Sequence, residues 1–258
     1  MSNGTTRTGP APLLSARNVT LQYKTKDHLV TATYRLSFDV LDGDRFVIVG
    51  PSGCGKSTLL KAIGGHLKPT EGELAIGGIP ITRPGPDRMM VFQEFDQLLP
   101  WKTVKENVVF ALTTGGGCSR KEAEARARIY IDKVRLTKFA DSYPHTLSGG
   151  MKQRVAIARA MALGPKLLLM DEPFAALDAL TRQRMQDELL QLWQDTRFSF
   201  IFVTHSISEA VLLGNRILVL SPHPGQVKAE LTSRGRADPD HSARLQETIE
   251  RLLLAETA

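Results

Sequence analysis

The chain has 258 residues, of which 42% are hydrophobic and 23% are charged, and its formal net charge is +6. This composition is typical of a globular protein and excludes a largely disordered, collagen-like or coiled-coil chain. No apolar run reaches the roughly eighteen residues of a membrane span, and the N-terminus lacks the apolar stretch of a secretory signal, so we expect a cytoplasmic protein.

The two cysteines, Cys54 and Cys118, form neither a disulfide framework nor a metal-binding pattern, so we expect free thiols. The six histidines show no metal-binding spacing, which argues against a metal site made of protein ligands alone. Lysine and arginine are scattered rather than clustered, which favours a solvated surface and predicts no nucleic-acid partner.

The N-terminal part of the chain predicts a tail followed by β structure. Residues 1–12 are polar and are expected to form a flexible tail. Residues 13–49 contain three β-prone runs, and the last of them, 45–49, is a buried strand that ends at Gly50. A helix is expected to follow, then a strand pair over 71–81, then a short buried strand over 89–93.

The middle of the chain predicts a helical lobe inserted into an α/β core. Two segments, 104–112 and 119–134, have helical spacing, and three glycines at 115–117 separate them. Beyond Gly150, helical and strand patterns alternate, which predicts a mostly parallel sheet. The expected strands cover 167–170, 198–205 and 216–220, the expected helices 151–163, 180–193 and 208–213, and a terminal helix is expected over 241–255.

The segment GPSGCGKS, residues 50–57, matches the phosphate-loop pattern GxxxxGK[ST]. Its glycines let backbone N–H groups converge on phosphate oxygens at the start of a helix. Lys56 would reach the β- and γ-phosphates, and Ser57 would coordinate Mg²⁺. The alternative is a chance glycine turn. The expected ATP contacts of this segment are Gly50, Pro51, Ser52, Gly53, Cys54, Gly55, Lys56, Ser57 and Thr58.

Two adjacent carboxylates, Asp171 and Glu172, end the apolar run LLLM. The carboxyl ends of strands converge on the ligand in open α/β sheets. Asp171 is therefore expected to hold Mg²⁺ and Glu172 to polarise the attacking water. The alternative is a pair of acidic residues that opens a turn before Pro173.

The segment LSGGMKQR, residues 147–154, resembles the signature motif of the ATP-binding-cassette (ABC) family. The family's other motifs are present in the family's order: Gln93 matches the Q-loop, Asp171 and Glu172 match Walker B, 175–178 matches the D-loop, and His205 matches the switch histidine. Two departures are Met151, where many members have Gln, and Ala175-Ala176, where Ser-Ala is frequent.

This resemblance implies a fold and a division of the chain. It implies an α/β P-loop NTPase cassette with a RecA-like core, an antiparallel β subdomain and an inserted α-helical subdomain over about 94–160. The ATPase domain would span 13–225, and a C-terminal extension with a helix would span 226–258. The activity that it implies is ATP hydrolysis coupled to transport.

The resemblance also implies residue roles. Glu172, His205, Gln93 and Lys56 would be catalytic, and Ser57, Gln93 and Asp171 would hold Mg²⁺. ATP and Mg²⁺ are the implied cofactors.

The signature segment of one subunit would close over ATP held by the other. Ser148, Gly149 and Gly150 would then act across a homodimer, and Asp178 of the D-loop would cross the same interface. For Ser148 the simpler interpretation is a helix cap, and the two roles are compatible. Tyr23 would stack on adenine, and the alternative is a core or surface tyrosine.

Two further stretches, 94–112 and 221–227, resemble the importer group for nitrate, sulfonates and taurine. Leu98, Leu99 and Trp101 would form a groove for the permease, with core packing as the alternative. The implied partners are membrane permease subunits and, indirectly, an extracytoplasmic solute-binding protein. The implied location is the cytoplasmic face of the inner membrane. The rival interpretations are a soluble non-transport ABC ATPase and a regulatory protein that only binds ATP.

Overall fold

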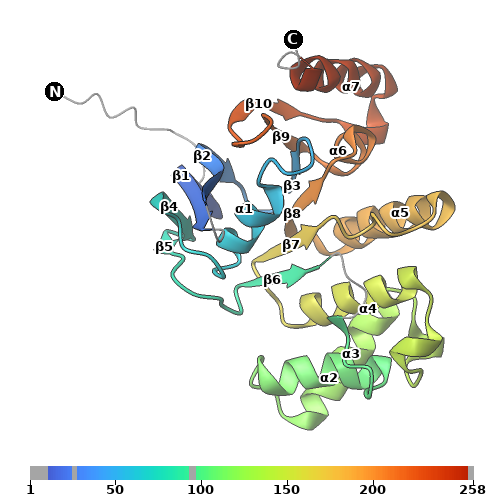
Figure 1. Cartoon of the computed structure of the whole chain (residues 1–258). Coiled ribbons are helices and arrows are strands. Elements are labelled where there is room, and N and C mark those ends of the chain that lie inside the picture. Colours follow the sequence, from blue (N-terminus) through green and yellow to red (C-terminus); the bar gives the residue numbers. More distant parts are fainter. Residues whose placement is uncertain (1–10, 25–27, 93–96, 255–258) are drawn as a thin grey trace.

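The computed structural model describes residues 11–24, 28–92 and 97–254. Two sheets and a separate group of helices make up the structure (Figure 1). The smaller sheet is antiparallel, in the order β2-β1-β4-β5, which confirms the predicted antiparallel β subdomain. Its strands are β1 (Leu14–Lys24), β2 (Leu29–Val40), β4 (Glu71–Ile76) and β5 (Ile79–Pro80).

The larger sheet has the strand order β10-β9-β3-β8-β7-β6. The four pairings that join β9 to β6 are parallel, as the alternation of strands and helices predicted, and only β10 runs antiparallel to its neighbour. The carboxyl ends of β3, β8 and β7 therefore lie side by side. The strands are β3 (Arg45–Val49), β6 (Arg88–Val91), β7 (Leu167–Asp171), β8 (Ser199–Thr204), β9 (Arg216–Leu220) and β10 (Val227–Thr232).

Helix α1 (Lys56–Ile63) lies between the two sheets (Figure 1). Its apolar residues share one buried cluster with the smaller sheet and with one face of the larger sheet. The opposite face of the larger sheet packs against α5 (Ala179–Thr196) and α6 (Ile207–Leu213). Because α1 is enclosed on both sides, the phosphate loop that precedes it is attached to a rigid support.

The inserted helices form the separate lobe that the sequence predicted. They are α2 (Val104–Thr114), α3 (Arg120–Lys133) and α4 (Gly149–Ala162), with short 3₁₀ turns at Thr137–Phe139 and Pro144–Thr146. Both α2 and α3 begin with a capping box, in which Thr103 pairs with Glu106 and Ser119 pairs with Glu122. These caps explain why each helix begins at its observed residue.

The C-terminal segment begins with strand β10, which was not predicted from the sequence. Valine, alanine and leucine alternate with polar residues over Val227–Thr232, a strand pattern that the polar neighbouring residues obscured. After a 3₁₀ turn at Gly235–Ala237, the predicted terminal helix is present as α7 (Pro239–Leu254). Leu245 and Ile249 of α7 are buried against the main core.

Across the described ranges, none of the helices is both long enough and apolar enough to span a bilayer.

Candidate nucleotide-binding and catalytic site

The phosphate loop connects β3 to α1. Gly53 and Gly55 have φ values of +81° and +95°, a left-handed conformation that side chains rarely tolerate. A Cβ atom on Gly55 would lie 2.5 Å from the carbonyl oxygen of Ala32. Glycine at position 55 is therefore required both by the backbone conformation and by the neighbouring strand β2.

Lys56 is buried at the centre of this loop, with 5% of its surface exposed. Its ammonium donates hydrogen bonds to the carbonyl oxygens of Gly50 at 2.9 Å and Pro51 at 2.8 Å. The cation therefore lies within the curve of the loop at the N-terminus of α1. Its charge adds to the positive end of the helix, which makes this place suited to phosphate.

Ser57 and Asp171 are 114 residues apart in sequence but meet at the base of the loop, where the Ser57 hydroxyl donates to Asp171 Oδ1 at 2.8 Å. Burial raises the pKa of the Asp171 carboxyl, and the neighbouring Glu172 charge adds to this effect, while the Ser57 hydrogen bond opposes it. A hydroxyl and a carboxylate are the oxygen ligands that suit Mg²⁺.

Among the described residues, no group of three or more histidine, cysteine or acidic side chains could hold a metal ion by itself. An ion at Ser57 and Asp171 would therefore need phosphate and water oxygens to complete its coordination. This is the usual arrangement for Mg²⁺ bound together with a nucleotide.

Glu172 and His205 form a second pair beside the first. His205 Nδ1 lies 2.9 Å from Glu172 Oε2, and the two residues follow the ends of the adjacent strands β7 and β8. Glu172 has a φ of +44°, and its N–H donates to the carbonyl oxygen of Val203 at 3.1 Å. This unusual backbone conformation turns the chain sharply at the end of β7.

A buried polar group below His205 was not foreseen from the sequence. The carboxylate of Glu209 accepts hydrogen bonds from the Thr204 hydroxyl at 2.6 Å and from Gln186 Nε2 at 3.0 Å. All three side chains are buried. They connect β8, α6 and α5 next to His205. The only sequence signal was a glutamate within the apolar run SEAVLL.

The signature residues lie at the start of α4. The Ser148 hydroxyl accepts from the N–H of Met151 at 3.3 Å, so Ser148 caps the helix. Ser148 is exposed, whereas Gly150 is buried, and a Cβ on Gly150 would lie 2.9 Å from Thr181 Cγ2 of α5. Gly150 thus permits close packing of α4 on α5, and Ser148 remains accessible at the helix N-terminus.

Asp178 has a similar position at the start of α5. Its carboxylate accepts from the N–H of Thr181 at 3.0 Å, and this hydrogen bond lowers the pKa of Asp178. Asp178 is exposed, so it can contact a partner while it caps its own helix.

Gln93, the predicted Q-loop residue, lies outside the described residues. The residues next to it are held against the signature helix α4. Gln153, which is fully buried on α4, donates to the carbonyl oxygen of Phe92 at 3.3 Å, and Gln97 donates to the same oxygen at 3.0 Å.

The remaining predicted contacts differ in exposure. Tyr23, at the end of β1, is 46% exposed, so its ring is accessible to a ligand. Trp101 is 69% exposed. Leu98 is only 4% exposed and packs in the core, so its side chain does not line the groove for the permease that the sequence predicted. Leu99 is partly buried beside it.

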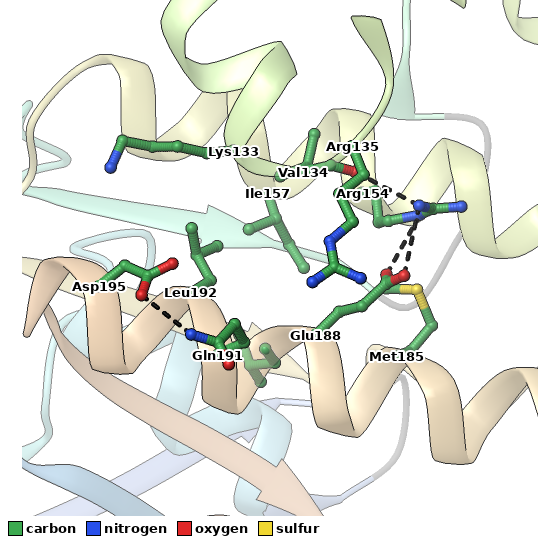
Figure 2. Close-up of a pocket in the computed structure, with 11 residues that line it drawn as sticks. Lys133, Val134, Arg135, Arg154, Ile157, Met185, Glu188, Gln191, Leu192 and Asp195 are labelled. Carbon is green, nitrogen blue, oxygen red and sulfur yellow. Dashed lines mark hydrogen bonds and ion pairs between the residues drawn. The ribbon is translucent and has the colours of Figure 1, made fainter. Parts of the chain in front are cut away.

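A cavity of about 60 Å³ lies away from the phosphate loop, between α4 and α5 (Figure 2). At its edge Arg154 of α4 pairs with Glu188 of α5 at 3.5 Å. None of the predicted ATP or Mg²⁺ residues lines this cavity.

The sequence profile of the ABC transporter family matches residues 34–175, which is more than half of the chain. The chain belongs to the ABC transporter ATP-binding family. The predicted fold and the assignment as an ABC-type ATPase are thereby confirmed. The profile match includes the phosphate loop, the signature and Walker B, so it covers the residues brought together at the ends of β3 and β7.

Relatives cover most of this ABC protein. It is 48% identical over 219 residues to the taurine import ATP-binding protein TauB of Rhizobium johnstonii, which is 85% of this chain and 80% of that protein. It is 48% identical over 203 residues to the nitrate import ATP-binding protein NrtD of Synechocystis, which is 79% of this chain and 76% of that protein.

Solved structures show the same fold. A dimeric ATP-binding cassette in a post-hydrolysis state, bound to ADP and phosphate, matches with a TM-score of 0.74 and 36% identity, over 86% of this chain and 99% of that one. CbiO1 of Clostridium perfringens matches with a TM-score of 0.77 and 24% identity, over 93% of this chain and 99% of that one. The second likeness is one of fold alone.

Proposed function

We propose that this chain is the ATP-hydrolysing subunit of an importer and that it works as a homodimer beneath a separate membrane permease. The observation that carries the proposal is the meeting of two side-chain pairs, Ser57–Asp171 and Glu172–His205, at adjacent strand ends next to a phosphate loop. Relatives named for taurine, nitrate and bicarbonate import support the transport role.

The hydrolytic chemistry consists mainly of positioning. Lys56 and the N–H groups of the loop would bind the phosphates, and Ser57 and Asp171 would hold Mg²⁺, which neutralises phosphate charge when bound. Glu172 would orient a water molecule and accept its proton. His205, which contacts the Glu172 carboxylate, would position that carboxylate and the γ-phosphate. Gln93 would couple the state of this site to the position of the helical lobe.

The location of the signature segment supports the proposed dimer. Ser148 is exposed at the N-terminus of α4, in the helical lobe, whereas the phosphate loop lies between the two sheets. We assign Ser148, Gly149 and Gly150 to the γ-phosphate bound by a second copy, with Asp178 at the same interface. A helix N-terminus with free N–H groups is suited to that anion.

The importer assignment adds partners and a location. The exposed Trp101, together with Leu99, would contact a permease segment, while Leu98 supports them from the core. The ATPase domain would span 13–225, with 226–258 as an extension. The subunit would sit peripherally on the cytoplasmic face of the membrane. A small solute with an anionic group, of the taurine, nitrate or bicarbonate kind, would be the cargo, delivered by a solute-binding protein.

The test is a tagged pull-down from detergent-solubilised membranes of the native host, followed by mass spectrometry. The proposal predicts a multi-spanning membrane protein in stoichiometric amount, and reduced recovery of that protein with Trp101→Ala. A control variant, Phe139→Ala, removes another exposed aromatic side chain and should not affect recovery. Purification of an active ATPase without any membrane protein would contradict the importer role and favour a non-transport ABC ATPase.

A further inference from the structure

The turn between β9 and β10, residues 221–226, contacts two other parts of the molecule. Its Gly225 donates from N–H to the carbonyl oxygen of Ala32 at 2.9 Å and accepts from the N–H of Tyr34 at 2.9 Å. These bonds join the turn to β2 of the smaller sheet, so that the β9–β10 hairpin lies beside β2 (Figure 1). The hairpin thereby connects the two sheets close to the phosphate loop.

Close contacts hold the phosphate loop at both ends. A Cβ on Gly225 would lie 2.2 Å from the carbonyl oxygen of Cys54, which leaves no room for a side chain. A Cβ on Gly50 would lie 3.1 Å from the carbonyl oxygen of Leu220, the residue just before the turn. On the other side, Gly55 approaches the carbonyl oxygen of Ala32. The loop is therefore enclosed between the turn and β2.

Ser221 maintains the shape of the turn. Its side chain is buried, its hydroxyl lies 3.0 Å from the carbonyl oxygen of Pro222 and 3.1 Å from that of Pro224, and it accepts from the N–H of Gln226 at 2.9 Å. The N–H of Ser221 also donates to the carbonyl oxygen of Gln226 at 2.9 Å. A turn with this many internal bonds presents Gly225 to the loop in one position.

We propose that the 221–226 turn positions the phosphate loop for nucleotide binding and that Gly225 is the positioning residue. The contact with Gly225 fixes the position of the Cys54 carbonyl oxygen. It thereby fixes the orientation of the Cys54–Gly55 peptide, whose N–H lies at the phosphate-binding end of the loop. The inference rests on nucleotide binding by residues 50–58 and is independent of the importer role. A methyl group at position 225 would push this peptide out of place.

The test compares Mg-ADP affinities of full-length variants by calorimetry, at a temperature where each variant is folded. Gly225→Ala is expected to weaken binding at least about tenfold, because overpacking at a tight contact displaces the backbone. Gly115→Ala is the matched control: its φ is −107°, and the nearest atom to its Cβ, the Ala111 carbonyl oxygen, is 3.3 Å away. Its affinity should equal that of the wild type.

A second variant, Ser221→Ala, removes the hydrogen bonds that the hydroxyl makes within the turn and adds no atom. It is expected to weaken Mg-ADP binding by a smaller factor than Gly225→Ala. If Gly225→Ala does not fold, the Mg-ADP affinity of Ser221→Ala tests the proposal alone. A purely structural turn would lower the unfolding temperature of these variants and leave the dissociation constant unchanged, which would overturn the proposal. Wild-type affinity in Lys56→Ala would overturn it too, since the loop itself would not be the nucleotide site.

Discussion

Asp171 and Glu172 are adjacent carboxylates with different surroundings. Asp171 receives a hydrogen bond from Ser57, and burial raises its pKa. Glu172 faces His205, which is exposed. The left-handed backbone conformation at Glu172 directs its side chain towards His205, whereas the Asp171 side chain contacts Ser57. One carboxylate is therefore suited to a metal ion and the other to a water molecule.

The variant Glu172→Gln tests the second role. The amide keeps the shape of the side chain but cannot accept a proton, so turnover should fall by at least about 100-fold while ATP affinity is retained. Phosphate release and nucleotide binding measure the two effects separately. Glu73→Gln, on the exposed part of β4, is the control and should hydrolyse ATP at the wild-type rate. Normal turnover in Glu172→Gln would remove Glu172 from the mechanism.

The variant Asp171→Asn tests the first role through stability as well as activity. Because burial raises the pKa of Asp171, the folded protein binds this proton more tightly than the unfolded chain, and stability is lost as the carboxyl ionises with rising pH. We expect Asp171→Asn to unfold at a higher temperature than the wild type at pH 7 without nucleotide. The gain should shrink towards about pH 4, near the ordinary pKa of aspartate.

Mg²⁺-dependent hydrolysis should be lost in the same variant. A lower unfolding temperature in Asp171→Asn at neutral pH would show that the carboxylate stabilises the fold, which contradicts this account of its burial.

At the scale of elements, α4 and α5 are joined by a pair of charges. Arg154 and Glu188 have side chains that are 20% and 28% exposed, and Arg154 also donates to the carbonyl oxygen of Val134 at 3.3 Å. The pair with Glu188 connects the helical lobe to the core beside the cavity of Figure 2. The position of the signature helix depends in part on this pair.

Glu188→Gln should therefore destabilise the protein by about 1–2 kcal/mol, because it leaves a largely buried guanidinium without its counter-charge. Denaturant unfolding measures the loss. Glu124→Gln breaks the exposed Arg120–Glu124 pair, whose side chains are 81% and 41% exposed, and should change stability very little. Equal free energies of unfolding of the two variants would show that the Arg154–Glu188 pair does not stabilise the fold.

Sequence patterns predicted most elements because periodicity and caps act locally. The runs at 45–49, 167–170 and 216–220 are strongly apolar, and their strands were predicted. Strand β10 was missed because it lies on the edge of the sheet, where half of its residues are polar. The contact of Gly225 with Cys54 joins residues far apart in sequence, and no local pattern indicates such a contact.

The site itself was predictable to a different degree at each position. The phosphate loop and Walker B were recognisable from residue types in a fixed order, and the structure places Ser57 beside Asp171 as expected. The buried group of Thr204, Gln186 and Glu209 was not, because ordinary strand and helix residues become a network only when β8, α5 and α6 pack together. Leu98 was expected at a partner surface, but apolar character alone does not distinguish core from interface.

At the scale of the whole molecule, the two segments that we propose to form one shared site, the phosphate loop and the signature, belong to different parts of the chain. The phosphate loop lies between the sheets, and the Ser148 end of α4 belongs to the helical lobe. No hydrogen bond among the described side chains connects Ser148 to the loop; its hydroxyl accepts from Met151. A complete site would require a second copy of the chain, so dimerisation should depend on nucleotide.

The most direct test is the molar mass of the Glu172→Gln variant by light scattering, with and without ATP. The account predicts a species of about twice 28.4 kDa in the presence of ATP and a monomer without it. Adding Ser148→Arg, which puts a bulky side chain at the signature, should keep the protein monomeric with ATP bound. A monomer in Glu172→Gln with ATP, or a dimer that forms equally well with Ser148→Arg, would contradict a composite site shared between two copies.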